Sequence, residues 1–172
     1  RKKLFFGPKS IFKYIVSINK KLDPFSQYVI EHYPRDTNSL RSKAPIILNL
    51  SFDQIIQGKS ELQKNFGITE NDKYVALVVR DSLYLNTINK NIDWKYHNYR
   101  DCNIDNYLLA AEMLANRGFY VLRMGKFVRD KINSKNKMII DYANSKSRSD
   151  LLDIYIAATC EFCISSGTGF DL

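Results

Sequence analysis

The stretch Tyr74-Val75-Ala76-Leu77-Val78-Val79 is apolar at every position and contains three valines. A strand with one solvated face alternates apolar and polar residues, whereas a strand covered on both faces reads as a continuous apolar run. The stretch therefore predicts a strand buried on both faces, as in a parallel sheet with helices on each side. It is far shorter than the ~20 residues of a membrane-spanning helix, so it does not indicate a membrane segment.

Three helices are predicted around this strand. Ser51 begins the first, because Gln54 completes a capping box with it. The second covers 104–115, where apolar residues recur at helical spacing. Ser147 with Asp150 forms another capping box and predicts the start of the third helix.

Shorter apolar runs predict further strands at 119–122, 138–140 and 162–164, and residues 81–103 are expected to form a long loop. Alternation of strands and helices indicates a parallel sheet with crossover connections. The expected fold class is therefore α/β, a Rossmann-like parallel sheet with flanking helices. We expect this fold to be incomplete at Leu172, because the chain ends three residues after a glycine turn that should open a helix.

Charge divides the chain into two parts. Of its 172 residues, 45% are apolar and 26% charged, which is typical of globular proteins and excludes a wholly disordered chain. Residues 1–21 hold seven of the 26 basic residues and no acidic one. We therefore expect a basic, irregular or helical segment at 1–50 and a Rossmann-like domain at 51–172. The basic segment suits an anionic membrane surface, nucleic acid or simply solvent.

The three cysteines, Cys102, Cys160 and Cys163, do not indicate a disulfide scaffold, and their low number suits a reducing compartment. Cys160 and Cys163 form a C-x-x-C pair, but no second pair and no nearby histidine completes a zinc site. We expect them to be buried structural cysteines at the start of a strand, and we predict no metal site.

Polar residues follow each predicted strand. In open α/β sheets, ligands bind beyond the carboxyl ends of the strands. That rule selects four places: Arg80-Asp81-Ser82, Arg123-Met124-Gly125, Asp141-Tyr142 and the run from Ser165 to Gly169. We expect these four tips to face one crevice.

The last of these places reads Ser165-Ser166-Gly167-Thr168-Gly169. Glycines let the backbone approach a ligand closely, and free N–H groups with nearby hydroxyls attract phosphate. The run lacks the dinucleotide fingerprint and follows the fourth strand instead of the first, which argues against a nicotinamide-dependent dehydrogenase. It predicts either a phosphate site or a plain tight turn.

Arg80 and Arg123 each come at the end of a predicted strand. Arginine makes bidentate, permanently charged contacts with phosphate oxygens, so both are candidate phosphate ligands. The alternative for each is an ion pair with a nearby carboxylate. Asp81 beside Arg80 is either a general base or the group that orients that arginine.

The segment 93–101 combines Trp94, Tyr96, His97 and Arg100 in nine residues. Aromatic rings with polar neighbours suit a sugar or a base, so Trp94, Tyr96 and Arg100 are candidate contacts. His97 is a candidate general base or a structural histidine. The alternative for the whole segment is a loop held by its own aromatic cluster.

These residues, taken together, resemble a bacterial family described as glycosyltransferases. The resemblance covers about residues 48–172, and its last part, 157–169, is similar to the donor-binding half of GT-B enzymes such as heptosyltransferases. The motifs that carry it are Val78–Leu85, Asp93–Asp101, Arg123–Gly125, Asp150–Ile154 and Ser165–Asp171.

The resemblance implies a GT-B donor-binding domain that takes a nucleotide-sugar as substrate and needs no metal or other cofactor. The residues that it implies as diphosphate ligands are Ser166, Gly167, Thr168 and Gly169. Arg80 and Arg123 would neutralise the leaving diphosphate. Asp81 or His97 would be the catalytic base.

We therefore expect a transferase that moves a sugar from this donor to a cell-surface glycan or a lipid-linked precursor. A cytoplasmic protein, peripheral at the inner face of the membrane through residues 1–21, would fit this activity. The alternative is a non-catalytic nucleotide- or nucleic-acid-binding α/β module, or a remnant kept for interaction. Because the basic charge is confined to one flank, no nucleic-acid partner is expected.

Overall fold

The computed structural model describes residues 17–18 and 49–167. The chain divides into two units, Arg1–Ile47 and Leu48–Leu172. The basic segment expected at 1–50 lies almost entirely outside the described residues, apart from helical Ser17 and Ile18 and the two residues before Ser51. The account below concerns the second unit.

The second unit contains a four-stranded sheet in which every pairing is parallel. Its strands are β1 (Lys73–Val78), β2 (Phe119–Met124), β3 (Ile139–Ile140) and β4 (Cys163–Ser165), in the spatial order β3-β2-β1-β4. The central strand β1 is buried at five of its six positions, as its continuous apolar run predicts. The α/β parallel-sheet prediction is confirmed.

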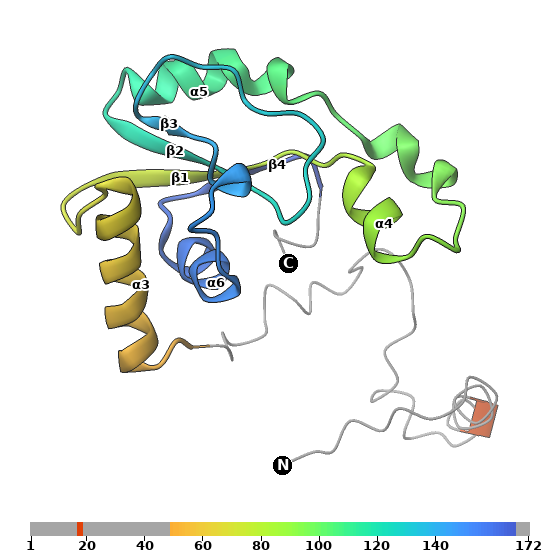
Figure 1. Cartoon of the computed structure of the whole chain (residues 1–172), viewed down its shortest axis with the longest axis horizontal. Coiled ribbons are helices and arrows are strands. Elements are labelled where there is room, and N and C mark those ends of the chain that lie inside the picture. The colour runs from red at the N-terminus through yellow and green to blue at the C-terminus, as the bar shows by residue number, and fades with distance from the viewer. Residues whose placement is uncertain (1–16, 19–48, 168–172) are drawn as a thin grey trace. The chain divides into compact units, whose positions relative to one another are not determined.

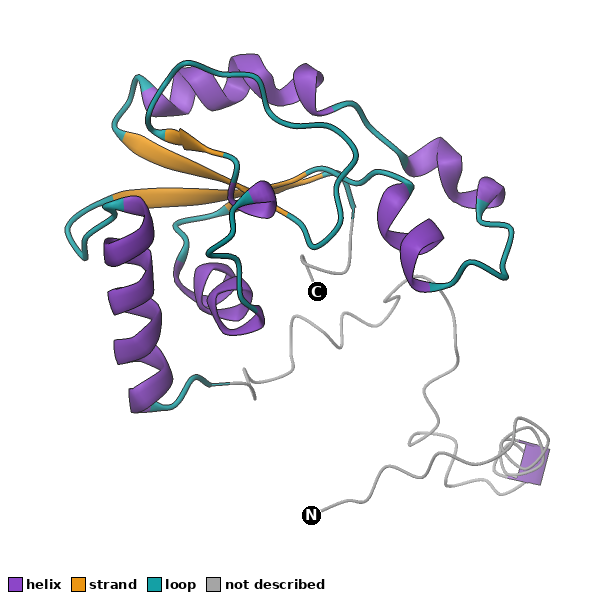
Figure 2. Cartoon of the chain, in the orientation of Figure 1, coloured by secondary structure: helices purple, strands orange, loops and turns teal. Residues whose placement is uncertain are grey.

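Helices cover both faces of this sheet (Figures 1 and 2). The helices α3 (Phe52–Phe66) and α6 (Asp150–Thr159) lie on one face. The 3-10 turn η3 (Ile104–Tyr107) and the helix α5 (Leu108–Ala115) cover the other face. The chain thus forms the three layers of a Rossmann-like sheet.

Alternation along β1 divides the core in two. Tyr74, Ala76 and Val78 pack with buried residues of α3 and α6. Val75 and Leu77 point to the opposite face and pack with buried residues of η3 and α5. Because successive side chains of a strand point to opposite faces, each residue of β1 contributes to one core only.

The expected start of α3 is confirmed. The Ser51 backbone N–H donates to Gln54 Oε1 at 2.8 Å, and the Gln54 N–H donates to Ser51 Oγ at 3.3 Å. The expected start of α6 at Ser147 is wrong by two residues. Ser149 caps this helix, because its backbone is extended (φ −136°) and its Oγ accepts from Leu152 N–H at 3.1 Å.

The prediction of a long loop at 81–103 is also wrong. It contains α4 (Leu83–Ile88), the 3-10 helix η2 (Lys95–Arg100) and short links between them. Single side chains stabilise these turns: Asp93 Oδ1 accepts from Lys95 N–H at 3.0 Å, and Trp94 Nε1–H donates to Asn89 O at 3.0 Å. Neither helix buries a residue, so the sequence has no apolar periodicity that would predict them.

Gly58 lies where α3 passes close to α6. A Cβ placed on Gly58 would lie 2.4 Å from two ring carbons of Tyr155, which real contacts do not allow. A glycine in the middle of a helix ordinarily weakens it. Here it permits the close approach of two helices that share one core.

The connection from β2 to β3, residues 125–138, has neither helix nor strand. Carboxylates from three other parts of the domain hold it in place. Asp81 Oδ2 accepts from Arg129 N–H at 2.8 Å, Asp141 Oδ2 accepts from Ile132 N–H at 3.3 Å, and Glu112 Oε2 accepts from Asn136 Nδ2–H at 3.1 Å. The segment therefore has a fixed path past the ends of the strands.

No helix among the described residues is both long and apolar enough to span a bilayer.

Candidate functional site

The strand order identifies one special place at the carboxyl edge. From β1 the chain moves to β2 and β3 on one side, and then returns to place β4 on the other side of β1. Ligands of open α/β sheets bind at such a reversal of strand order. The two strand ends are linked there: Ser166 N–H donates to Val78 O at 3.1 Å, and Arg80 N–H donates to Ser166 Oγ at 2.8 Å.

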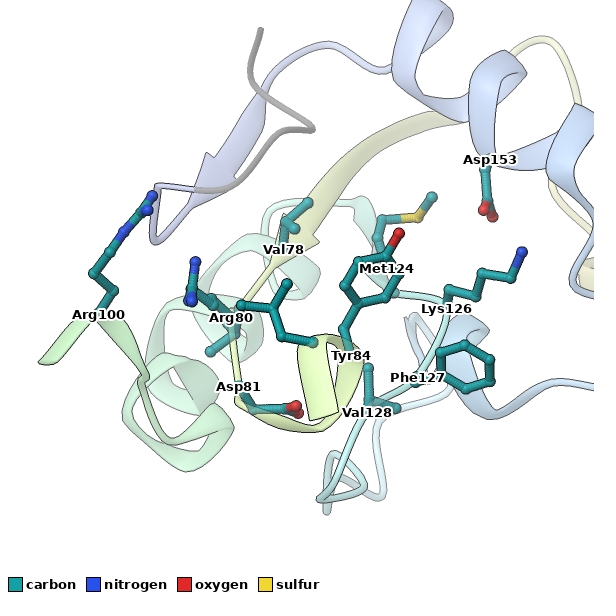
Figure 3. Close-up of a pocket in the computed structure, with 13 residues that line it drawn as sticks. Val78, Arg80, Asp81, Tyr84, Arg100, Met124, Lys126, Phe127, Val128 and Asp153 are labelled. Atoms are coloured by element: carbon teal, nitrogen blue, oxygen red, sulfur yellow. The ribbon is translucent and has the colours of Figure 1, made fainter. Parts of the chain in front are cut away.

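A cavity of about 630 Å³ opens at this edge. It is lined by the ends of β1 and β2, the start of α4, residues 125–128, Arg100 and Asp153 (Figure 3). Its volume lies within the range of ligand sites for small molecules and cofactors. Of the predicted site residues, Arg80, Asp81 and Arg100 line it.

Arg80 lies two residues after the end of β1, and its side chain is largely buried. Its Nε–H donates to Asp101 Oδ1 at 3.2 Å, and the two side chains are 14% and 18% exposed. The Arg80 carbonyl accepts from Cys102 N–H at 2.9 Å, so the backbone is held as well. Arg80 thus forms the ion pair considered as an alternative while it still borders the cavity.

Arg100 borders the cavity next to the turn that follows β4. Its Nη2–H donates to Gly167 O at 2.6 Å. Within residues 49–167, no carboxylate lies within 4 Å of this guanidinium. Arg100 is therefore the arginine whose charge is best placed to meet an anionic ligand.

Arg123 does not line the cavity. Its side chain is 1% exposed, and Nη1 lies 3.3 Å from Asp141 Oδ1. Arg123 pairs with Leu77 across the β1–β2 ladder and so points to the face covered by α5. The expected phosphate role is corrected here: Arg123 forms a buried ion pair that fixes the end of β3.

Asp81 uses both carboxylate oxygens for the backbone. Oδ1 accepts from Leu83 N–H at 2.8 Å, and Oδ2 accepts from Arg129 N–H at 2.8 Å. The ion-pair partner of Arg80 is Asp101 and not Asp81. Asp81 therefore does not orient Arg80 but joins α4 to the β2–β3 connection, and its role as a general base stays a prediction.

Trp94, Tyr96 and His97 contact one another instead of the cavity. The ring centroids of Tyr96 and His97 lie 4.1 Å apart, and those of Trp94 and His97 lie 5.9 Å apart. His97 Nδ1 is buried and has no hydrogen-bond partner among the described residues. The structure thus favours the alternative of a loop held by its own rings, and His97 does not line the cavity.

The turn after β4 is described as far as Gly167. Gly167 adopts φ +82°, a conformation that favours glycine, and its N–H donates to Ser165 Oγ at 3.1 Å. Thr168 and Gly169 lie outside the described residues. Ser166 and Gly167 adjoin the cavity through their bonds to Arg80 and Arg100.

Several lining residues were not predicted as site residues, among them Tyr84, Lys126, Phe127 and Asp153. Lys126 and Phe127 come directly after the predicted Arg123-Met124-Gly125 tip, so extending the same rule by two residues would have found them. Tyr84 and Asp153 lie in the first turns of α4 and α6, within the motifs Val78–Leu85 and Asp150–Ile154, but they were not singled out as site residues. Burial and a hydrogen bond to Asp153 Oδ1 at 2.8 Å raise the pKa of the neighbouring Tyr142 above its usual value.

Cys160 and Cys163 are only partly buried, whereas the sequence predicts buried structural cysteines. Cys160 ends α6, and burial raises the pKa of its thiol. In the part of the chain that the structure describes, no group of three or more histidine, cysteine or acidic side chains is placed to hold a metal ion.

Comparison of the chain with family models, with curated proteins and with solved structures gives no match in any of the three.

Proposed function

We propose that this domain binds a nucleotide-sugar donor as part of a glycosyltransferase, with a cell-surface glycan or a lipid-linked precursor as acceptor. One observation carries the proposal. A cavity of small-molecule size lies at the carboxyl edge of a parallel sheet, at the reversal of strand order, with two arginines on its border. The resemblance to GT-B donor-binding domains supports the choice of a nucleotide-sugar over other anionic ligands.

The charge arrangement suits a diphosphate. Arg100 places its guanidinium beside the turn of Ser166 and Gly167, and Arg80, paired with Asp101, adds a second arginine there. Arginine donors strengthen as negative charge develops on a leaving nucleoside diphosphate, which is how a glycosyltransferase stabilises its transition state without a metal. The proposal gives Arg123 no contact with this group, because its guanidinium is buried against Asp141.

The proposal assigns the donor half of the reaction to this domain. Asp81 and His97 are occupied by local structure and are not proposed as the base. The base would then come from another part of the protein or from the acceptor's own surroundings.

The test measures binding of UDP, GDP, CMP and ADP to the full chain by titration calorimetry. We expect one of them to bind, and Arg100→Gln to weaken it at least tenfold, which is about 1.4 kcal/mol. Arg117→Gln is the matched control, since this exposed arginine lies at the opposite edge of the sheet, before β2.

Two results would count against the proposal: no nucleotide binds, or Arg100→Gln binds as well as the unchanged protein. Turnover separates the transferase from the alternative module. Release of nucleoside diphosphate from the matching nucleotide-sugar, stimulated by a membrane extract, supports the transferase. Tight binding with no release under any condition supports the non-catalytic nucleotide-binding module.

A further inference from the structure

We infer that the cavity holds the base of the nucleotide against Tyr84 and Phe127, with Asp81 as the residue that positions both rings. This inference rests on the proposed function and specifies how the donor lies in its site. Its evidence is the distribution of side chains along the cavity, the geometry of the two rings and the two hydrogen bonds of Asp81.

The cavity has two unlike ends. In Figure 3, Arg80 and Arg100 lie at one end. Phe127 and Asp153 lie at the other end, and Tyr84 lies between the two. The cation at the aromatic end, Lys126, lies 3.8 Å from Asp150 Oδ1, whereas Arg100 has no carboxylate partner within residues 49–167. We therefore expect a ligand with an anionic group and a flat ring to place its anion toward the arginines and its ring toward the aromatic side chains.

Tyr84 and Phe127 form an open aromatic pair. Their ring centroids lie 6.3 Å apart with an interplanar angle of 36°, so the rings are neither stacked nor edge-on. The residues are 43% and 37% exposed, which is high for large apolar side chains that line a cavity. A planar base placed against them would cover this surface, and stacking of a base on an aromatic ring stabilises binding for every base.

Two polar side chains, Asp153 and Lys126, lie near the rings and suit the polar edge of a nucleoside. Asp153 faces the cavity and already accepts from Tyr142 Oη–H, and it pairs with Arg148, so its position is fixed. Lys126, 45% exposed, also lines this end. An acceptor and a donor are therefore available to ribose hydroxyls or to the edge of a base.

Asp81 connects the two elements that carry the rings. One oxygen accepts from the N–H of Leu83, the residue before Tyr84, and the other accepts from the N–H of Arg129, two residues after Phe127. Both bonds measure 2.8 Å. One carboxylate thus sets the start of α4 and the β2–β3 connection relative to each other, and Asp81 is a positioning residue for the aromatic pair.

The test compares two probes on the same variants: inorganic diphosphate and whichever nucleoside diphosphate of the panel binds best. We expect Tyr84→Ala and Phe127→Ala each to weaken the nucleotide about tenfold and to leave inorganic diphosphate unchanged. Tyr84→Phe retains the ring and should retain affinity. Tyr99→Ala is the matched control, because Tyr99 is 84% exposed and does not line the cavity.

Asp81→Asn tests the positioning role. An amide has one acceptor oxygen in place of two, so one of the two backbone bonds is lost. We expect weaker binding of the nucleotide with unchanged binding of inorganic diphosphate, a difference that general destabilisation would not produce. Circular dichroism and the thermal midpoint identify any variant that does not fold.

The outcomes separate this inference from the proposed function. If neither probe binds the unchanged protein, the proposed function fails and the inference fails with it. If the nucleotide binds and depends on Arg100 but not on Tyr84 or Phe127, only the inference is overturned. Equal loss of both probes in the ring variants also overturns it, because the rings would then act on the phosphate end or on the fold.

Discussion

At the scale of single residues, several side chains act differently from what their chemistry alone suggests. Asp81 has the residue type and location of a general base, but two backbone N–H groups occupy its oxygens. Arg123 has the residue type of a phosphate ligand, but its side chain is 1% exposed and meets Asp141. Residue type and sequence position thus bring these groups to the right edge of the sheet, while their hydrogen-bond partners determine what they can do.

Gly58 gives a prediction at this scale. Glycine to alanine in a helix ordinarily gains about 0.5–1 kcal/mol. At Gly58 the new Cβ would meet the ring of Tyr155, which is 5% exposed and packed in the core. Overpacking of this kind typically costs about 1–3 kcal/mol, so we expect Gly58→Ala to lower the free energy of unfolding.

Urea denaturation measures this effect, with Ser60→Ala as the control. Ser60 is an exposed residue of the same helix, and its replacement should leave stability unchanged or slightly raised. Equal stability of Gly58→Ala and the unchanged protein would mean that α3 and α6 do not approach as closely as described.

At the scale of elements, the caps determine where the helices begin. Ser149 Oγ accepts from Leu152 N–H, whereas Ser147 contributes its backbone N–H to Ser145 Oγ at 3.1 Å. Loss of a serine N-cap costs about 1 kcal/mol. We expect Ser149→Ala to lower the free energy of unfolding by about that amount and Ser147→Ala to leave it nearly unchanged. Paired urea titrations test this, and the opposite ranking would restore Ser147 as the cap.

The sequence predicted those elements whose burial imposes a pattern. The run at 74–79 is apolar throughout because both faces of β1 are covered. The apolar residues of 104–115 recur at helical spacing because η3 and α5, into which this predicted helix divides, pack on one face of the sheet. The elements α4 and η2 bury no residue and depend on single hydrogen bonds, so no periodic pattern could reveal them.

The sequence predicted the location of the site but only part of the residues that line it. The carboxyl-edge rule brought Arg80 and Asp81 to the cavity. It failed for Arg123 because β2 continues to Met124, two residues past the expected end, so Arg123 lies inside the strand and alternation directs it to the other face. The aromatic pair could not be predicted, since Tyr84 and Phe127 are far apart in the sequence and belong to two segments that a long-range hydrogen bond of Asp81 joins.

At the scale of the whole second unit, burial and strand pairing are greatest in the middle of the sheet and decrease toward the site. The strand β1 pairs with neighbours on both sides and is buried at five of six positions. The elements α4 and η2 bury nothing, and the β2–β3 connection is held by a few side chains. Local opening is easiest where few apolar contacts oppose it, and ligand-binding segments are commonly drawn from such regions.

Hydrogen exchange followed by mass spectrometry should show this gradient. Without ligand, we expect amides of 75–78 to exchange slowest and those of 83–100 to exchange much faster. With a saturating nucleoside diphosphate, protection should appear at 83–88 and 125–129, because the base would fix the two elements that Asp81 joins. The amides of β1 should change little, since pairing already protects them on both sides.

The amino edge of the sheet provides the internal control for that experiment. A second cavity of about 510 Å³ lies there, lined by residues of α3, the turn 69–72 and the end of α6. Protection confined to 69–72 would place the nucleotide at the wrong edge of the sheet and contradict the proposed site. Protection at both edges would indicate a general tightening of the domain, whereas protection at the carboxyl edge alone is the result that the side-chain arrangement predicts.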